Sequence, residues 1–113
     1  MGLFDKAKAA VKTREADVLK ACLSYLRLRG HLAIRINGGV AITVSSNRLR
    51  CTDTPGCADI LGLSRDGRFY AVECKSSSGR QSAEQKEFEK DCVSRGGLYV
   101  LARSVDDLKE AGL

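Results

Sequence analysis

The chain has 113 residues, a length that suits one domain and is too short for two independent hydrophobic cores. Hydrophobic residues make up 43% and charged residues 29%, which argues against a disordered chain and against a fibrous repeat. No apolar stretch is long enough to cross a membrane, and the first residues lack the apolar segment of a signal peptide. We therefore expect an intracellular, cytoplasmic protein.

The net charge of +5 is unevenly distributed along the chain. Residues 1–50 carry ten Lys and Arg against three acids, whereas residues 51–113 carry nine against eleven. A basic half favours a polyanionic partner such as nucleic acid, because phosphate contacts release condensed counterions. A solvated basic helix would give the same charge count.

The five cysteines contain no C-x-x-C pair, which argues against a disulfide framework and against a zinc ribbon. We expect reduced, mostly buried thiols. A zinc-binding regulatory domain built from His31, Cys51 and Cys57 would lack the closely spaced ligand pairs that such sites use.

In the first half of the chain, periodicity predicts one helix and two strands. Apolar residues at helical spacing predict a helix over 13–29 with Thr13 as its N-cap, after a segment, 1–12, that we expect to fray. Alternation predicts strands over 32–36 and 40–44, and the intervening Asn37-Gly38-Gly39 predicts that they form a hairpin. Residues 45–56 are polar and basic and are expected to form a long, functional loop.

The second half predicts an antiparallel strand pair followed by helix, strand and helix. Strands over 58–63 and 68–74 flank a turn that contains Asp66-Gly67. Residues 82–85 form a capping box that opens a helix to about residue 95, a strand over 98–102 follows, and residues 104–107 open a last helix in the same way. We expect a single mixed α/β domain over 1–113.

Two acidic residues lie where an apolar side chain would be expected. Glu15 projects from the apolar face of the first helix, where a carboxylate is costly unless it is paired or binds a cation. It is simply solvated if this first turn overhangs the core. Asp59 opens an almost wholly apolar strand, where its simplest role is to cap the preceding turn.

Glu73 and Lys75 change this interpretation. Residues two apart on a strand face the same side, so these two side chains project together at the end of an apolar strand while Cys74 points the other way. If the Asp66-Gly67 turn joins adjacent strands, Asp59 lies nearly opposite Glu73. Two carboxylates that close favour an oxygen-liganded divalent cation, and a plain cross-strand salt bridge is the alternative.

Gln85 has two possible roles. Its place in the capping box lets it reach back to the Ser82 amide. It also lies on the same side of its helix as Phe88 and Cys92, which is the side expected to face the core and the acidic residues.

These elements resemble, in order and spacing, the VRR-NUC (virus-type replication-repair nuclease) domain of the PD-(D/E)xK nuclease superfamily. The resemblance runs from about Thr13 to Leu108 and rests on Glu15 in a first helix, Arg35-Ile36-Asn37-Gly38-Gly39, Gly56-Cys57-Ala58-Asp59-Ile60-Leu61-Gly62, Val72-Glu73-Cys74-Lys75 and Ser82-Ala83-Glu84-Gln85-Lys86. One departure is that Ala58 stands where a proline is expected before the aspartate, with the sole proline at Pro55.

The resemblance implies a restriction-endonuclease-like core, a mixed β-sheet flanked by helices, and a Mg²⁺- or Mn²⁺-dependent endodeoxyribonuclease. In it, Asp59, Glu73 and the Cys74 carbonyl would hold the metal, Glu15 would complete the set through a water, Lys75 would position or activate the attacking water, and Gln85 would orient Lys75 or the site. A chain of this size resembles the stand-alone phage and bacterial members, whose relatives act as dimers.

Five residues are expected to contact DNA without reading its sequence. They are Arg35, Asn37, Arg48, Arg50 and Arg80. We expect a homodimer that resolves four-way junctions by paired nicks, since twofold symmetry presents two sites to a nearly twofold-symmetric substrate. The alternatives are a flap-directed or general DNA nuclease, and a nucleic-acid-binding module that has kept the fold without the chemistry.

Overall fold

A computed structural model describes residues 14–36, 40–42, 48–50 and 53–113, of which 40–42 and 48–50 are described by their backbone. The elements, in chain order, are α2 (Glu15–Leu28), β1 (Leu32–Arg35), β2 (Val40–Ile42), β3 (Arg48–Arg50), β4 (Ile60–Leu63), β5 (Phe69–Cys74), α3 (Ala83–Ser94), β6 (Leu98–Ala102) and α4 (Val105–Glu110). Within the described residues, no helix is both long and apolar enough to cross a membrane.

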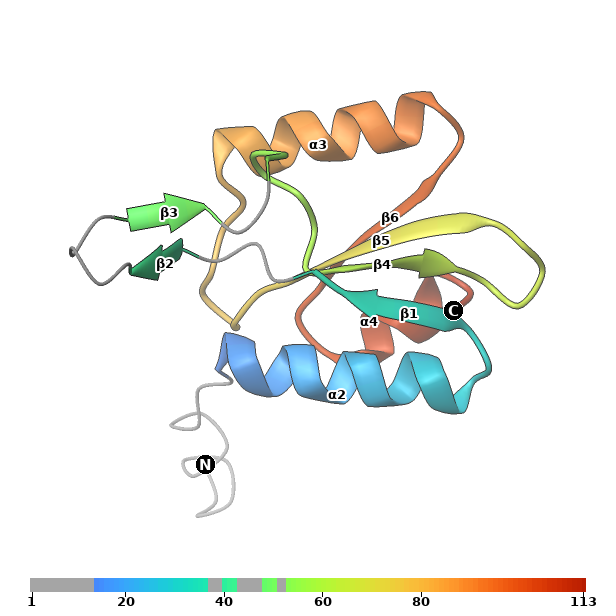
Figure 1. Ribbon diagram of the computed structural model, residues 1–113. Coiled ribbons are helices and arrows are strands. Elements are labelled where there is room, and N and C mark those ends of the chain that lie inside the picture. The colour runs from blue at the N-terminus through green and yellow to red at the C-terminus, as the bar shows by residue number, and fades with distance from the viewer. Residues whose placement is uncertain (1–13, 37–39, 43–47, 51–52) are drawn as a thin grey trace, which may run out of the picture.

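A four-stranded sheet in the order β1-β4-β5-β6 forms the centre of the molecule. The β1·β4 and β4·β5 pairs are antiparallel and the β5·β6 pair is parallel. Helix α3 covers one face of the sheet, and α2 and α4 cover the other (Figure 1). The architecture is therefore mixed α/β, as the sequence predicts.

The main core lies on the α2 and α4 side of the sheet. It contains Leu26 and Cys22 from α2, Tyr70 and Val72 from β5, and Leu108 from α4. Alternation along β5 sends the intervening residues to the opposite face, towards α3, so both faces of this strand are covered. A polar side chain can therefore be buried near the end of β5, which is an interior strand of the sheet.

Glycine is required at position 62 of β4. A Cβ there would overlap the carbonyl of Leu32 and crowd the hydroxyl of Tyr70. That hydroxyl donates a hydrogen bond of 2.8 Å to the same Leu32 carbonyl. The absent side chain thus allows Tyr70 to reach across β4 and hold β1.

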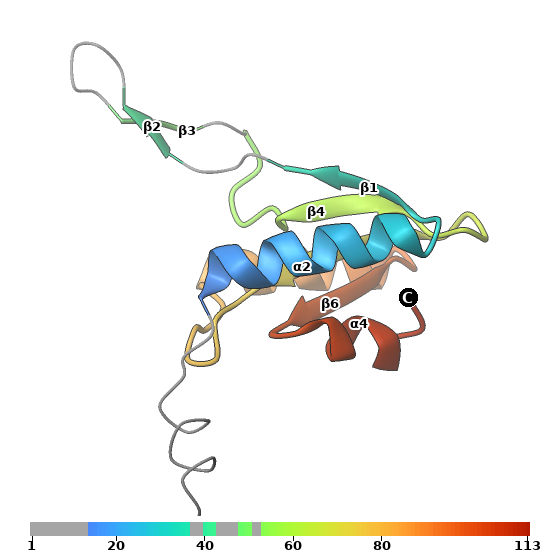
Figure 2. The same ribbon diagram turned by 90° about the horizontal axis from the view of Figure 1, so that it is seen from below.

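Two predictions for residues 32–56 are wrong. The strands over 32–36 and 40–44 do not form a hairpin with each other, because β1 pairs with β4 while β2 pairs with β3. Part of the predicted loop over 45–56 is the strand β3. The two short strands form a separate ribbon that projects away from the sheet (Figure 2).

The structure forms some of the predicted N-terminal helix caps and not others. The capping box at Ser82 is formed in full, with Gln85 as its third helical residue. Helix α2 has Arg14 as its N-cap, and the expected cap Thr13 lies outside the described residues. At α4 the helix forms, but the Ser104 side chain makes no cap bond. The Asp107 carboxylate accepts from the Arg103 N–H at 2.8 Å.

Candidate metal centre

Asp59 and Glu73 lie side by side at one end of the sheet. Ile60 pairs with Val72 in the antiparallel register, which places Asp59, just before β4, next to Glu73 of β5. The Glu73 side chain lies on the α3 face and its residue is 1% exposed. The predicted meeting of these two carboxylates is confirmed.

Glu15 reaches the same place from the other side of the sheet. It is the first residue of α2, is exposed, and lies where this helix extends to the end of the sheet (Figure 1). Carboxylate oxygens of Glu15, Asp59 and Glu73 lie within 4.8 Å of one another. The first turn of α2 is therefore exposed, as the solvated interpretation of Glu15 expects, and its carboxylate lies in the cluster.

Lys75 and Gln85 both contact the same oxygen of Glu73. The Lys75 ammonium lies 3.8 Å from Glu73 Oε1, and its side chain is largely buried. Gln85 Nε2 donates to Glu73 Oε1 at 2.9 Å, while Gln85 Oε1 accepts from the Ser82 N–H at 2.8 Å. One glutamine thus caps α3 and orients the buried carboxylate, so both possible roles are realised.

Asp59 is held in place by the neighbouring strand and by the loop that precedes it. Its Oδ2 accepts a hydrogen bond of 2.8 Å from the backbone N–H of Cys74. In that loop Gly56, at φ +74°, packs so closely against the backbone of Glu84 that a side chain would overlap it. This contact joins the segment entering Asp59 to the first turn of α3, which carries Gln85.

The side chain of Cys74 lies on the opposite face of β5, as the alternation predicts. It is fully buried in the main core, where it contacts the thiol of Cys22. That contact and burial raise its pKa far above the usual range of a thiol. Cys22, Cys74 and Cys92 are buried, as predicted, whereas Cys57 is half-buried and Cys51 lies outside the described residues.

The electrostatics of Glu73 are unfavourable for an anion without a cation. Burial, followed by the charge of the adjacent Asp59 carboxylate, raises the pKa of Glu73 from 4.5 to about 8. The Lys75 ammonium acts in the opposite direction but offsets only part of this effect. The carboxylate needs additional positive charge to be ionised at neutral pH.

The donor set fits a divalent cation. Glu73 Oε2 is buried and has no hydrogen-bond partner within the described residues. A buried carboxylate oxygen without a donor is costly, whereas a metal ion would satisfy it. The candidate ligand atoms of Glu15, Asp59 and Glu73 are carboxylate oxygens, which are the ligands preferred by hard cations such as Mg²⁺.

The five residues expected to contact DNA are only partly described. Arg35 ends β1 opposite Ile60, next to Asp59, and Arg80 lies in the segment between β5 and α3; both are exposed. Arg48 and Arg50 belong to β3, where only the backbone is described, and Asn37 lies outside the described residues. Two of the five are therefore placed at the carboxylate end of the sheet.

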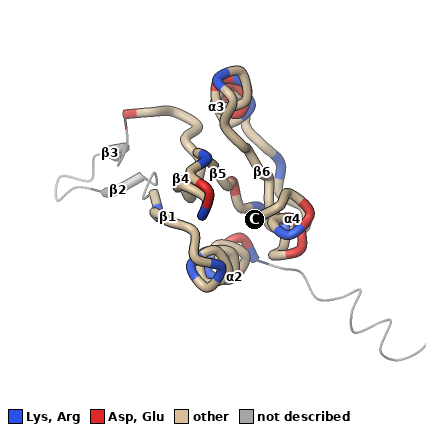
Figure 3. Tube along the Cα trace, turned by 90° about the vertical axis from the view of Figure 1, so that its right-hand side faces the viewer, with Lys and Arg blue, Asp and Glu red and all other residues tan. Residues whose placement is uncertain are grey.

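His31 is not part of this cluster. Its Nδ1 accepts from the Arg65 N–H at 3.0 Å, so its Nε2 carries the proton and donates to the Leu113 carbonyl at 2.9 Å. Both ring nitrogens are used, which argues against a zinc ligand. Figure 3 shows the molecule from the end opposite the carboxylate cluster, where Lys and Arg lie on α2 and beside the β4–β5 turn.

Tyr99 and Gln81 border the centre and were not singled out from the sequence. Gln81 Nε2 donates to the Tyr99 hydroxyl at 3.1 Å and to Glu89 Oε1 at 3.0 Å. Burial raises the pKa of Tyr99 well above its usual value. A tyrosine in an apolar strand gives no sequence signal for this contact, because only the packing of α3 on β6 creates it.

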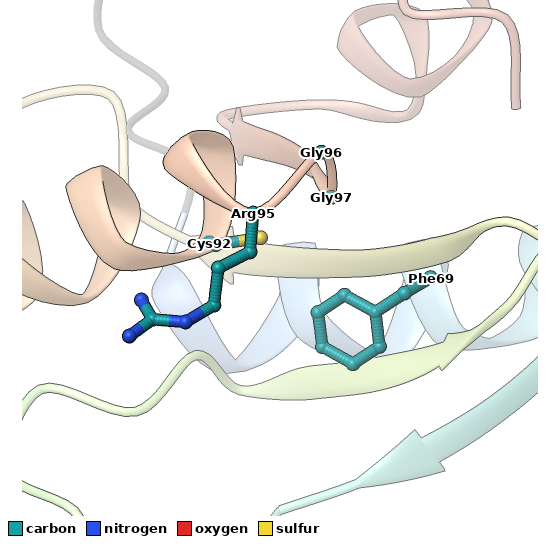
Figure 4. A pocket seen from close by; sticks show the side chains of 5 residues that line it. All are labelled: Phe69, Cys92, Arg95, Gly96 and Gly97. Carbon is teal, nitrogen blue, oxygen red and sulfur yellow. The ribbon is translucent and has the colours of Figure 1, made fainter.

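A pocket of about 430 Å³ lies away from the carboxylates, at the C-terminal end of α3. Its lining residues are Phe69, Cys92, Arg95, Gly96 and Gly97 (Figure 4). Phe69 begins β5 and Glu73 lies near its end, roughly 13 Å further along the strand. The pocket contains no carboxylate, so the acidic cluster remains the candidate site for chemistry.

Comparison with known proteins identifies the fold. A solved structure described as "VRR_NUC domain" superposes with a TM-score of 0.62 over 87% of this chain and 92% of that chain, at 17% sequence identity. The chain has the VRR_NUC fold. No family model matches the sequence, and no curated protein matches it. The VRR_NUC fold is a restriction-endonuclease-like arrangement of a mixed sheet flanked by helices, as predicted from the resemblance.

Proposed function

We propose that the protein is a metal-dependent endonuclease that hydrolyses phosphodiester bonds of DNA. One observation carries this proposal: carboxylates from three separate elements, α2, the start of β4 and the end of β5, converge beside a buried lysine. A protein without such chemistry has no need to bury Glu73 with one oxygen lacking a donor. The VRR_NUC fold supports the same conclusion.

The proposed ligands are Asp59, Glu73 and the backbone carbonyl of Cys74, with Glu15 acting through a water. They would hold Mg²⁺ or Mn²⁺, which suits a site of few carboxylates because Mg²⁺ normally keeps several waters. Such an ion supplies Lewis-acid stabilisation of the phosphoryl oxygens and a more acidic water.

The chain's own groups have separate tasks in this mechanism. Gln85 and the Cys74 N–H fix the orientations of Glu73 and Asp59. The Lys75 ammonium, beside Glu73, orients the attacking water and adds positive charge next to the scissile phosphate. Arg35, Asn37, Arg48, Arg50 and Arg80 would contact flanking phosphates without reading sequence.

The test measures cleavage of labelled linear, flap and four-way-junction DNA with Mg²⁺, with Mn²⁺ or with EDTA. We expect cleavage with either metal, none with EDTA, and none in Asp59→Asn or Glu73→Gln at enzyme levels that give complete cleavage by the wild type. DNA binding should survive in both variants or tighten, because a negative charge near phosphate is removed. Asp106→Asn, an exposed acid of α4, is the matched control and should cleave normally.

Full activity in either site variant would overturn the assignment of the metal ligands. DNA binding by the wild type without any metal-dependent cleavage would favour the alternative function, a nucleic-acid-binding module of the same fold.

We also infer that the protein acts as a homodimer on branched DNA. Leu32 and Ile34 of β1, Leu63 of β4 and Phe69 of β5 form an apolar patch on the α3 side of the sheet, each between 42% and 54% exposed. An apolar patch is self-complementary, unlike a charged one, and a twofold interface requires self-complementarity. Equal cleavage of linear and junction DNA would instead favour a general nuclease.

A further inference from the structure

The segment that joins β5 to α3 is tethered by an arginine from elsewhere in the chain. Arg103 follows β6, and its Nη1 donates to the carbonyls of Ser76 and Gly79, both at 2.7 Å. Within the segment, the Gly79 N–H donates to Ser76 Oγ at 3.0 Å. Hydrogen bonds from a guanidinium are stronger than neutral ones, so Arg103 fixes the conformation of residues 76–79.

This tether determines where the backbone donors of the segment point. In a planar trans peptide the carbonyl and the following N–H point in opposite directions. Because the Ser76 and Gly79 carbonyls are turned towards Arg103, the N–H groups of Ser77 and Arg80 are directed away from it. Neither N–H donates to another residue that the structure describes. Ser77 and Arg80 are exposed.

The segment lies at the same end of the molecule as the carboxylate cluster. It follows Lys75 directly in the chain, and in both ribbon views it passes close to the N-terminal end of α2, where Glu15 lies (Figures 1 and 2). The β2–β3 ribbon projects on the other side of that end (Figure 2). A DNA strand that crosses the cluster would therefore pass the ribbon on one side and residues 76–80 on the other.

We propose that Arg103 is a positioning residue for DNA binding. Its hydrogen bonds hold residues 76–80 so that the free N–H groups of Ser77 and Arg80 face a backbone phosphate of DNA beside the bond that is cut. The ligand is a phosphodiester, contacted by backbone donors and by the Arg80 side chain without regard to base sequence. The proposal rests on the proposed function, since it assigns a DNA contact next to the carboxylate cluster.

The test measures binding of a fluorescent four-way junction in EDTA, so that cleavage does not intervene. Single phosphates around the wild-type cut position are replaced one at a time by uncharged methylphosphonates. We expect one replacement to weaken binding by the wild type roughly tenfold, the value of a charged hydrogen-bond contact. Arg103→Met should weaken binding of unmodified DNA by a similar factor and should lose the sensitivity to that one replacement.

Arg27→Met is the matched control. Arg27 also donates from its side chain to a backbone carbonyl, that of Ala33 at 3.2 Å, but it lies near the C-terminal end of α2, away from the cluster. It should retain the wild-type pattern of sensitivity. Ser77→Pro removes one proposed donor without changing Arg103 and should reproduce the loss at the same phosphate, which keeps the proposal testable if Arg103→Met fails to fold.

The outcomes separate this proposal from the proposed function. A purely structural role of Arg103 would lower the melting temperature without changing which phosphate is sensitive, and an unchanged sensitivity pattern in Arg103→Met and in Ser77→Pro would overturn the proposal. Failure of the wild type to bind or cut DNA would overturn the proposed function itself.

Discussion

At the scale of single residues, Gln85 shows how one side chain serves the fold and the site together. Its carbonyl oxygen closes the capping box of α3 and its amide nitrogen holds Glu73. Because the two ends of one amide have opposite hydrogen-bonding character, the helix start and the buried carboxylate have a fixed relative position. The stability of α3 and the geometry of the centre are therefore linked through this residue.

Gln85→Glu separates the two roles. A glutamate preserves the capping box but places a third acid against Glu73, which then loses the amide donor that Gln85 supplies. We expect α3 and the fold to persist, as measured by circular dichroism. Cleavage or metal affinity should fall by about 10- to 100-fold, the usual effect of removing a group that orients a metal ligand. Wild-type activity would show that Gln85 acts only as a cap.

The raised pKa of Glu73 predicts a pH dependence for the metal-free protein. Folded Glu73 keeps its proton until about pH 8, whereas the unfolded chain releases it near 4.5. The folded state thus binds more protons between these values, so the stabilisation is complete below about pH 4.5 and is lost as the pH rises to about 8.

Urea unfolding in EDTA between pH 5 and pH 8 measures this effect. We expect the wild type to lose on the order of a few kcal/mol of unfolding free energy relative to Glu73→Gln over that range. Mg²⁺ should restore stability at pH 8 in the wild type. Parallel pH profiles for the two proteins would contradict the proton-binding role of Glu73.

At the scale of elements, the β2–β3 ribbon is separate from the main sheet and projects from the end that carries the carboxylates (Figure 2). Arg48 and Arg50 occupy alternate positions of β3, opposite Ile42 and Val40. From the sequence alone, these two arginines were predicted to lie in a loop.

Removing both arginines tests whether the ribbon contacts DNA. Arg48→Gln with Arg50→Gln should weaken DNA binding and lower the slope of log affinity against log salt by about 2, roughly one unit for each lost phosphate contact. Arg65→Gln with Arg68→Gln, at the opposite end of the sheet, is the matched control and should leave the slope unchanged. An unchanged slope in the ribbon variant would place the DNA surface elsewhere.

At the scale of the whole molecule, its two ends differ in character. Carboxylates from three elements meet at one end, whereas the β4–β5 turn and the end of α2 lie at the other. Between them, α3 covers only part of its face of the sheet, which leaves the patch of Leu32, Ile34, Leu63 and Phe69 exposed. The patch is the surface on which the proposed dimer depends.

A charge placed in this patch should prevent dimerisation. Ile34→Glu exposes a carboxylate to its own copy across the twofold axis, and we expect light scattering to show a dimer for the wild type and a monomer for the variant. Junction cleavage should change from paired cuts to single nicks. Val93→Glu, an exposed apolar residue of α3, is the control. A monomeric wild type at working concentration would rule out the dimer.

Local signals in the sequence determined much of the fold and the centre of the site. The capping box at Ser82 and the Asp66-Gly67 turn act over a few residues, so their outcome is independent of distant parts of the chain. Once the β4–β5 turn is placed, the period of two in a strand brings Asp59 and Glu73 together. The carboxylate pair was therefore predictable, as was its neighbour Lys75.

Only the tertiary structure decided which distant segments meet. The Asn-Gly-Gly turn signal favoured a local hairpin, but pairing of β1 with β4, supported by the Tyr70 hydroxyl, prevailed because it completes the central sheet. Glu15 joins the cluster because α2 extends to the end of the sheet from the opposite face. Arg103 left no pattern at all, since a side chain that binds backbone carbonyls imposes no spacing on the residues it holds.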